Sequence, residues 1–436
     1  MISNVAPWLA SSRWSTVPIR RVARLGSGHT PSRQHPEYWE NCTIPWVTLA
    51  DVWQLRDAGL SVISETRECV SPLGVARSAA VRHPAGTVIL SRTASVGFSA
   101  ILGKDMATSQ DFATWTCGAR LLPEYLLYAL RAMAPDLRRL STGSTHKTIY
   151  MPDIEQLQVP LPGLTEQRRI ADLLAAQTDQ IDQLVAHRRL QVELFKLRTF
   201  AGVFQAIRGS RVLGPRKRSG LSWLGHVPFD WPVATVSSQY EVLLGKMLNP
   251  ERLQGASLRP YLRNTNVQWD RIDIGNLFRM DFPASERSRY RVLPGDLLVC
   301  EGGQPGRAAI WRGETDEVYY QKALHRVRER GYSSTRWLYY CLRVATALNV
   351  FAVEGNQTTI AHLTCEQLRA HRFPFPSREM QDRLIEDLDE MQAAEREFTS
   401  YADRQVELLE ERRRALIVAA VTGQMDVAMA RGVDVS

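Results

Sequence analysis

The stretch that decides the fold runs from Gly143 to Arg198 and reads GSTHKTIYMPDIEQLQVPLPGLTEQRRIADLLAAQTDQIDQLVAHRRLQVELFKLR. It begins as a polar loop and continues as a short apolar strand bounded by Pro160 and Pro162. It then predicts one long helix, because neither Gly nor Pro occurs between Leu164 and Ala201. A passage of the same order occupies residues 355–414. A loop, a proline-bounded strand and a long helix, used twice, predict two modules, each tied to a helical arm.

Matches elsewhere in the chain extend this duplication to both modules. Trp14 matches Trp231 at an offset of 217, EYLLYALRA (124–132) matches RWLYYCLRV (336–344) at 212, and EQRRI (166–170) matches MQDRL (380–384) at 214. Small changes in offset correspond to short loop insertions, so we interpret the chain as a tandem duplication of about 213 residues.

The predicted fold class is α+β, with two tandem mixed α/β modules joined by two long antiparallel helices that form a coiled coil. Alternating residues predict strands in 44–52, in 86–103 with a polar turn, in 259–269 and in 294–311, and apolar spacing predicts a helix over 122–133. The predicted boundaries are 1–163 for the first module, 164–208 for its arm, 209–218 for a linker rich in Gly, Pro and basic residues, 219–377 for the second module, 378–427 for the second arm and 428–436 for a tail.

Each arm carries a heptad pattern that would bury a stripe against the other arm. In the first arm the two heptad positions are Leu174, Ile181, Arg188 and Phe195, and Ile170, Gln177, Leu184 and Gln191. An offset of 214 gives Leu388, Glu395, Ala402 and Leu409, and Leu384, Met391, Phe398 and Gln405. The residues predicted to form the spacer and partner-docking helices are Ile170, Leu174, Ile181, Leu184, Phe195, Leu384, Leu388, Met391, Phe398 and Leu409. At 1.5 Å per residue, ~40 residues give a rod of roughly 60 Å.

Composition limits the class of protein. With 436 residues and 44% apolar residues, the chain has the length of two to three globular domains. No apolar run is long enough to span a membrane, and the first residues lack the features of a signal peptide, so we expect a cytoplasmic location. Six scattered cysteines without a CxxC pair predict buried, reduced thiols. The net charge of +8 permits a polyanionic partner such as nucleic acid.

Catalytic motifs are missing from the sequence. It contains no Pro-Pro dipeptide, which the D/N-PP-Y/F turn of amino-group DNA methyltransferases requires, and no phosphate-cradling G-x4-G-K-[ST] loop. The histidines His146, His325 and His362 are dispersed, and no acidic pattern of a metal nuclease is present. The sequence therefore predicts no catalytic residue and no metal site, and favours a binding or scaffold role.

Both modules instead contain loops rich in side chains that read or position nucleic acid. Arg and Lys bind guanine, Asn and Gln bind adenine, and Ser, Thr and Lys hold phosphates. The candidate DNA-binding residues are Ser91, Arg92, Thr93, Ser109, Gln110, Ser144, Thr145, His146 and Lys147 in the first module, and Arg263, Asn264, Asn266, Gln304, Arg307, Gln321, Lys322, Asn356 and Gln357 in the second. Each of them taken alone is better explained as a solvated loop residue, but their clustering at equivalent repeat positions predicts two DNA-reading surfaces.

The sequence resembles the DNA-specificity subunits of type I restriction-modification systems. The resemblance is carried by GSTHKTIYMPDIEQLQVPLPGLTEQRRIADLL (143–174), SGLSWLGHVPFDWPVATV (219–236), LIVAAVTGQMDV (416–427), GTVILSRTASVG (86–97) and PGDLLVCEGGQPG (294–306). Three departures are Gly163 in place of a second proline, the loose SREMQ (377–381), and Glu301 where the first half has Arg92.

This resemblance implies a non-catalytic subunit with two target-recognition domains that recognise an asymmetric bipartite double-stranded DNA site. It implies that two modification (methyltransferase) subunits dock on the helices and methylate adenine, and that restriction (translocase and nuclease) subunits join them. It places S-adenosylmethionine, ATP and Mg in those partners, with no cofactor and no metal in this chain. The alternatives are a coiled-coil protein-interaction scaffold without DNA specificity and a solitary methyltransferase that binds S-adenosylmethionine itself.

Overall fold

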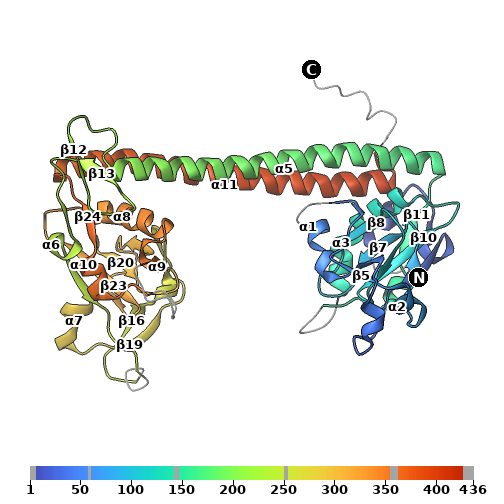
Figure 1. Ribbon diagram of the computed structural model, residues 1–436, viewed down its shortest axis with the longest axis horizontal. Coiled ribbons are helices and arrows are strands. Elements are labelled where there is room, and N and C mark those ends of the chain that lie inside the picture. Colours follow the sequence, from blue (N-terminus) through green and yellow to red (C-terminus); the bar gives the residue numbers. More distant parts are fainter. Residues whose placement is uncertain (1–5, 57–59, 142–146, 250–253, 354–361, 426–436) are drawn as a thin grey trace. The chain divides into compact units, whose positions relative to one another are not determined.

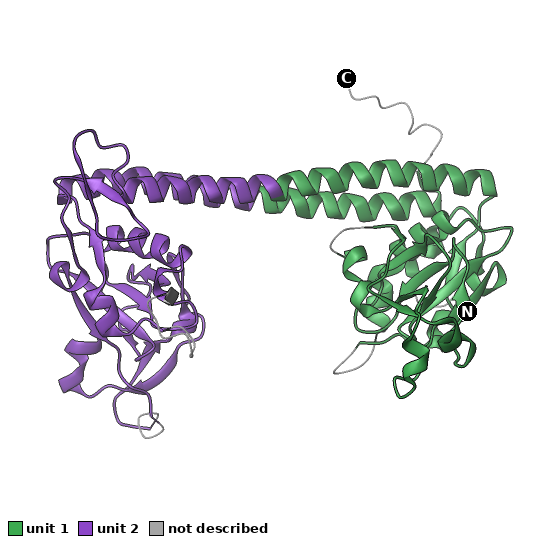
Figure 2. Ribbon diagram, in the orientation of Figure 1, with its two compact units in different colours: residues 1–189, 402–436 green, residues 190–401 purple. Residues whose placement is uncertain are grey.

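A computed structural model describes residues 6–56, 60–141, 147–249, 254–353 and 362–425. The chain divides into two compact units, residues 1–189 with 402–436 (unit 1) and residues 190–401 (unit 2) (Figure 2). Both chain ends therefore belong to unit 1. Both unit boundaries fall inside the long helices α5 (Leu164–Ile207) and α11 (Arg378–Thr422).

Unit 1 is built on two mixed sheets. The strand order of the first is β2 (Ala23–Ser27), β10 (Phe112–Cys117), β7 (Val88–Ser91), β8 (Ser99–Leu102) and β4 (Val62–Ile63). The order of the second is β5 (Glu68–Val70), β3 (Ile44–Val47), β9 (Met106–Thr108) and β6 (Arg82–His83). A two-stranded sheet pairs β1 (Thr16–Pro18) with β11 (Gln158–Pro160). The helices are α1 (Trp53–Arg56), α2 (Pro72–Ala76), α3 (Pro123–Leu140), α4 (Met151–Glu155), the first part of α5 and the last part of α11.

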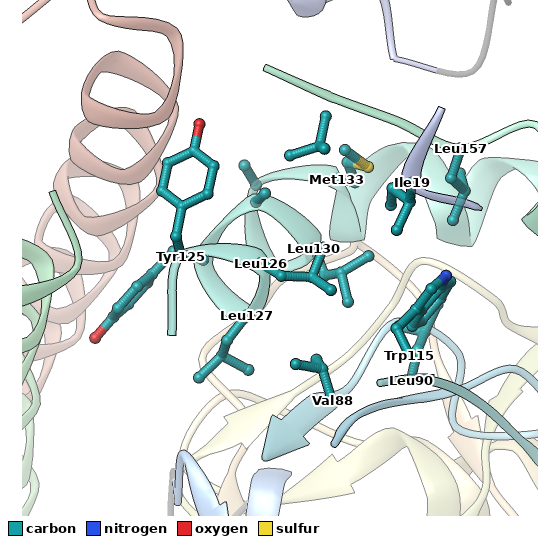
Figure 3. Close-up of a cluster of buried hydrophobic side chains, with 14 of the residues drawn as sticks. Ile19, Val88, Leu90, Trp115, Tyr125, Leu126, Leu127, Leu130, Met133 and Leu157 are labelled. Atoms are coloured by element: carbon teal, nitrogen blue, oxygen red, sulfur yellow. The ribbon is translucent and has the colours of Figure 1, made fainter. Parts of the chain in front are cut away.

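The core of unit 1 lies between helix α3 and strands β7 and β10. Leu126, Leu130 and Met133 of α3 pack with Val88 and Trp115, as Figure 3 shows. The spacing of these helix residues places them on one face, which is why the apolar pattern predicted this helix. The helix continues past Pro135 to Leu140, so this proline lies inside it rather than ending it.

Unit 2 repeats the plan with one strand fewer in each of its two main sheets. One sheet has the order β15 (Tyr240–Leu244), β23 (Leu324–Glu329), β20 (Leu297–Cys300) and β21 (Ala308–Ile310), and another has β19 (Phe278–Asp281), β16 (Leu258–Leu262) and β22 (Tyr319–Tyr320). Three two-stranded sheets pair β12 (Arg216–Arg218) with β13 (His226–Pro228), β14 (Val233–Thr235) with β24 (Arg372–Pro374), and β17 (Val267–Gln268) with β18 (Arg271–Ile272). The helices besides α5 and α11 are α6 (Val236–Gln239), α7 (Ala284–Tyr290), α8 (Thr335–Ala347), α9 (Val350–Val353) and α10 (Cys365–Ala370) (Figure 1).

Three predictions of local structure need correction. The predicted strand over 259–269 is interrupted by a 3-10 helix (Asn264–Asn266) between β16 and β17. The predicted strand over 44–52 ends at Val47, because Thr48 and Asp51 cap a short 3-10 helix with reciprocal hydrogen bonds. Part of the predicted linker is ordered, since strand β12 includes Arg216, whose guanidinium donates to the carbonyls of Arg208, Gly209 and His226. The module and arm boundaries given above remain predictions.

Within each unit, α5 and α11 form an antiparallel pair, as predicted. In unit 1, Asp182 pairs with Arg413 at 3.2 Å and Arg189 with Glu410 at 3.4 Å. Residue numbers rise along α5 as they fall along α11, so the two helices are antiparallel. In unit 2, Phe195 stacks on Phe398 with ring centroids 5.0 Å apart.

The buried seam of the helix pair differs from the prediction at one of its two heptad positions. Leu184 is 49% exposed, whereas its neighbour Val185 is 8% exposed, and Val192 follows Val185 after seven residues. The second position is therefore Thr178, Val185, Val192 and Thr199, while Leu174 and Ile181 of the first position are buried as predicted. In α11, Leu388 and Ala402 are buried, and Gln392 takes the place predicted for Met391. One of the two heptad positions of the seam therefore lies one residue after its predicted place, and the other lies where it was predicted.

A buried glutamine fixes the start of each long helix. Gln167 accepts a hydrogen bond from the Leu122 amide and donates to the carbonyls of Arg120 and Pro162. Gln381, 214 residues later, accepts from the Ser334 amide and donates to the Ser333 hydroxyl and the Pro376 carbonyl. Both side chains are fully buried, and each satisfies backbone groups that would otherwise lack partners. The repeat therefore extends to the joint between module and arm.

Candidate nucleic-acid interface

The β7–β8 turn carries the first candidate residues of unit 1. Strand β7 ends at Ser91, and the turn reverses with the Gly97 amide donating to the Ser91 carbonyl and Gly97 at φ +92°. The Arg92 side chain reaches across this turn: Nε donates to the Gln110 carbonyl at 2.9 Å and Nη1 to the Ile149 carbonyl at 3.3 Å. Arg92 therefore ties three chain segments together and is half-buried.

Other predicted residues of unit 1 lie beside Arg92. Thr93 forms a bridge with Thr148, and the Ala94 amide donates to the carbonyl of Lys147, whose side chain is exposed. Gln110 is exposed, and its side-chain oxygen accepts a hydrogen bond from Thr30 at 2.5 Å. The structure thus brings together Arg92, Thr93, Gln110 and Lys147, although they come from three loops. Ser144, Thr145 and His146 lie outside the described residues.

A close backbone approach holds the Gln110 loop in place. A Cβ on Gly28 would lie 1.9 Å from the Thr108 carbonyl oxygen, so only glycine fits there. The repeat uses the same device, because a Cβ on Gly245 would lie 2.1 Å from the Gln321 carbonyl oxygen. A glycine therefore packs against the backbone at the end of β9 in unit 1 and directly after β22 in unit 2, and fixes the loop that follows each strand.

In unit 2 the candidates around Asn264 form a hydrogen-bonded group. Asn264 donates from Nδ2 to the Gly302 carbonyl at 2.7 Å, and its Oδ1 accepts from Arg307 Nη2 at 2.8 Å. Arg263 lies over the ring of Phe278, 3.7 Å from its centroid, and donates to the Asn276 carbonyl. These contacts orient two guanidinium groups at the edge of unit 2.

The remaining candidates of unit 2 lie on neighbouring loops. Gln304 and Lys322 are exposed, and Gln321 is half-buried beside Gly245. Asn356 and Gln357 lie outside the described residues.

Three candidate residues are enclosed by the protein and offer no surface to a duplex. Ser91 is 0% exposed, Ser109 2% and Asn266 4%. Ser109 donates to the Asp111 carboxylate, and Asn266 accepts from the Arg263 amide while donating to the Asp273 carbonyl. We therefore correct their assignment from contact residues to residues that shape the loops.

The two units place different side chains on equivalent backbone. In unit 1 the Arg92 amide donates to the Asp111 carbonyl, and the Arg92 carbonyl accepts from Ile149. In unit 2 the Glu301 amide donates to the Ala323 carbonyl, and the Glu301 carbonyl accepts from Leu363. Glu301 therefore occupies the position of Arg92, and the reversal of charge at this point changes what each unit can bind.

The buried histidines His83 and His325 do not add charge to the candidate interface. The His325 ring donates from Nε2 to the Leu363 carbonyl at 2.7 Å, and burial lowers the pKa of its imidazole. Burial likewise lowers the pKa of His83, with the charge of Arg24 acting in the same direction. Lowered pKa values keep both rings neutral at neutral pH, so neither adds positive charge for a polyanion.

No group of three His, Cys, Asp or Glu side chains capable of holding a metal ion occurs among the described residues. In the same part of the chain, no helix is long and apolar enough to cross a membrane.

Sequence reasoning missed one exposed arginine–aromatic pair. The Arg33 guanidinium lies 3.6 Å from the centroid of the Trp39 ring and pairs with Glu68 at 2.5 Å. Arg263 on Phe278 is the comparable pair of unit 2. The only signal in the sequence is an aromatic residue six positions after Arg33, which is too common to single out.

Comparison with known proteins gives a consistent picture. Residues 11–194 match the family model of the type I restriction modification DNA specificity domain. The specificity subunit of the type I restriction enzyme MjaIX from Methanocaldococcus jannaschii is 27% identical over 185 residues. These residues are 42% of this chain and 41% of that protein. The EcoR124I/EcoR124II specificity subunit of Escherichia coli is 23% identical over 177 residues, 39% of this chain and 41% of that protein. The chain spans about two fifths of the length of these curated relatives.

Solved structures show the fold over nearly the whole chain. A chain from a structure titled as the basis of complex assembly and conformational transition of the type I R-M system has a TM-score of 0.73 at 17% identity, covering 94% of this chain and 98% of that one. The HsdS subunit of Thermoanaerobacter tengcongensis has a TM-score of 0.51 at 15% identity, covering 94% and 97%. The resemblance to type I specificity subunits and the predicted fold class are confirmed.

Proposed function

We propose that this chain is the sequence-specific DNA-binding subunit of a type I restriction-modification complex and recognises an asymmetric bipartite site. The observation that carries the proposal is the repeated loop framework with different side chains on it, Arg92 in one unit and Glu301 in the other. Two copies of one framework bind two short sequences, and unlike side chains make those sequences unlike.

In this proposal each unit reads one half-site and the paired helices set the gap between them. Helix α5 continues without a break from Leu164 to Ile207, and its 44 residues correspond to about 66 Å at 1.5 Å per residue. Two helical turns of DNA, at ~34 Å each, have a similar length. A helix of this length is of the size needed to hold two readers on one duplex.

The chain itself performs no chemistry in this proposal. Two modification subunits dock on the helices and bring S-adenosylmethionine, and restriction subunits bring ATP and Mg. Leu190, Leu194 and Leu197 of α5 are each at least 55% exposed, and they support docking of other proteins on this helix. The whole complex would act in the cytoplasm.

The test of this function is the methylation pattern of DNA. Coexpression of the chain with its modification subunits should place methyladenine at one bipartite motif, made of two unlike half-sequences separated by a fixed gap. Long-read sequencing of the host DNA gives both half-sites and the gap. Omission of this chain is the control and should abolish the motif. Salt-independent or absent DNA binding by the assembled complex would instead favour the coiled-coil scaffold without DNA specificity.

Arg92→Ala is expected to weaken binding to the first half-site by ~1–3 kcal/mol. The variant removes a guanidinium that holds the Gln110 and Ile149 carbonyls, so the turn loses its cross-links as well as a possible base contact. The measurement is competition binding by the assembled complex, with duplexes substituted in one half-site at a time.

The second half-site is the internal control for Arg92→Ala, and discrimination there should be unchanged. A loss that is equal for all duplexes, substituted or not, would show that Arg92 clamps a phosphate and contributes nothing to base reading.

A further inference from the structure

A basic pocket in unit 1 lies apart from the candidate reading residues. It has a volume of about 260 Å³ and is bordered by the turn residues Gly97–Ser99, by α3 and by the last part of α11. Five arginines line it, namely Arg56, Arg131, Arg138, Arg413 and Arg414, against one carboxylate, that of Glu410. Such a concentration of like charge in one small cavity needs a counter-charge.

Two carboxylates near the pocket are already engaged. Glu410 pairs with Arg189 at 3.4 Å, and Asp182 pairs with Nη1 of Arg413 at 3.2 Å. The Nε atom of Arg413 is buried and has no hydrogen-bond partner in the described part of the chain. An unsatisfied, buried, charged donor at the pocket wall indicates an acceptor that this chain does not supply.

Three further arginines of the pocket, Arg131, Arg138 and Arg414, keep most of their donors available. Arg131 donates to the Leu60 carbonyl at 3.4 Å and lies 5.6 Å from the Tyr128 ring centroid. Arg138 and Arg414 have exposed side chains, and neither forms an ion pair with any residue that the structure describes. At least three guanidinium groups can therefore converge on one bound anion.

The electrostatics of Arg131 agree with a missing counter-ion. Burial is the main cause that lowers the pKa of its guanidinium, and repulsion from Arg413 lowers it further. Tyr128, Asp182 and Asp179 raise it again but do not restore the ordinary value. The charge is thus under-compensated in the free chain, and a bound anion would relieve it.

The fold itself does not require this cluster. Shifted by the repeat offsets of 212 and 214, Arg131 corresponds to Arg343, but Arg138 corresponds to Val350, and Arg413 and Arg414 correspond to Thr199 and Phe200. In unit 2, Arg343 faces the carboxylate of Glu395 at 3.9 Å. Unit 2 therefore has the same fold with one arginine and one carboxylate at the equivalent place. The arginine cluster of unit 1 is not needed for this fold.

We propose that this pocket binds one phosphate of the DNA backbone and anchors unit 1 without reading bases. The inference rests on the proposed function. DNA is favoured over a free anion because Gly97 and Phe98 of the pocket wall belong to the same β7–β8 turn that carries Arg92 and Thr93. A phosphate contact at this wall fixes the register of the neighbouring turn on the duplex, as backbone contacts do.

The test measures how DNA binding by the assembled complex depends on salt. Each phosphate contact contributes about 0.9 to the slope of log K against log salt concentration. The variant is Arg138→Ala with Arg414→Ala, since both side chains are exposed and their loss should leave the fold intact. The matched control is Arg20→Ala with Arg120→Ala, which removes two exposed arginines of unit 1 that do not line the pocket. Thermal unfolding verifies that all complexes are folded.

The expected result is a slope smaller by about 0.9 for the pocket variant than for the control variant. The preference for the recognised site over a substituted duplex should stay the same in both. Equal slopes would overturn the proposal, and so would a changed preference with an unchanged slope, which would make these arginines base readers.

Two further measurements distinguish other ligands. If inorganic phosphate stabilises the wild-type chain but not the pocket variant, while the DNA slopes are equal, the site takes a free anion and the DNA assignment is wrong. If the pocket variant fails to assemble with the modification subunits in gel filtration, the pocket binds an acidic side chain of a partner, which also overturns it. A wild-type complex without site preference would refute the proposed function instead.

Discussion

Asp270→Asn should lower the free energy of unfolding of unit 2 by about 3 kcal/mol, since it removes the buried carboxylate that three arginines share. The Asp270 side chain is 2% exposed, and its carboxylate accepts hydrogen bonds from Arg336, from Arg312 at 3.3 Å and from Arg396 at 2.8 Å. Loss of one partner of a buried ion pair costs ~3–5 kcal/mol, and the lower end applies because Asp389 still faces Arg336.

The effect is local because the network joins separate segments of unit 2. Asp270 lies in the β17–β18 turn at φ +57°, Arg336 lies on α8 and Arg396 on α11. Asparagine tolerates this backbone conformation, so the variant tests charge rather than strain. Hydrogen exchange of the α8 amides (Thr335–Ala347) measures the loss, and the amides of α3 in unit 1 are the internal reference.

Asp316→Asn is the matched control, because it makes the same chemical change on an exposed side chain of the same unit. The α8 protection of this variant should equal that of the wild type. Equal protection in Asp270→Asn as well would mean that the arginines find sufficient compensation elsewhere, and the network would then carry no net stability.

The same network predicts a dependence on pH. Burial raises the pKa of Asp270, but hydrogen bonds and charge from Arg336, with further contributions from Arg396 and Arg312, outweigh burial and bring the pKa below its ordinary value. A lowered pKa means that the stabilisation is complete above the unfolded value of about 3.9 and is lost as the pH falls through the folded value. The difference between wild type and Asp270→Asn should therefore be constant near neutral pH and vanish in acid.

Removal of one heptad from each long helix should shorten the gap between half-sites and leave both half-sequences unchanged. The segments are residues 185–191 of α5 and 404–410 of α11, which face each other according to the antiparallel register of Asp182 with Arg413. Seven residues preserve the heptad phase and shorten a helix by about 10.5 Å. This length corresponds to at most about three base pairs at ~3.4 Å each, and the twist of the duplex limits the change further.

Long-read sequencing of methylated host DNA measures the new gap directly. The control variant replaces an exposed residue of the same segment, His187→Ala, without a change in length, and should keep the original gap. A shortened pair of helices with the original gap would show that the helices do not set the spacing. Loss of the half-sequences themselves would show that the deletion disturbs the units.

The architecture could be predicted from the sequence because it is repeated and periodic. The proline-bounded strand, the uninterrupted helix and the buried Leu174 and Ile181 all follow from local patterns. The one-residue error at Leu184 has a physical cause. Ile170 is buried in the core of unit 1 together with Val159 and Leu157, so its apolar character reflects packing on the module and misled the assignment of the helix seam.

The candidate interface was less predictable, because side-chain roles depend on contacts that are distant in sequence. Asn266 was predicted to read bases, yet it repeats the role of Asp51, 215 residues earlier, which accepts a hydrogen bond from the Thr48 amide as Asn266 does from Arg263. A comparison of the repeats at these positions would have indicated this. No local signal, in contrast, links Asp270 to arginines 42, 66 and 126 residues away.

Unit 1 contains both ends of the chain, and this has a consequence for the order of folding during synthesis. The Tyr125 hydroxyl donates to the Val421 carbonyl, the Arg13 amide donates to the Thr422 carbonyl, and Ile417 and Ala420 complete the core around α3. Unit 2, in contrast, is one continuous segment from residue 190 to 401. The ribosome therefore releases everything that unit 2 needs before it releases the last helix of unit 1. The part of the protein that is synthesised first is the last to be completed.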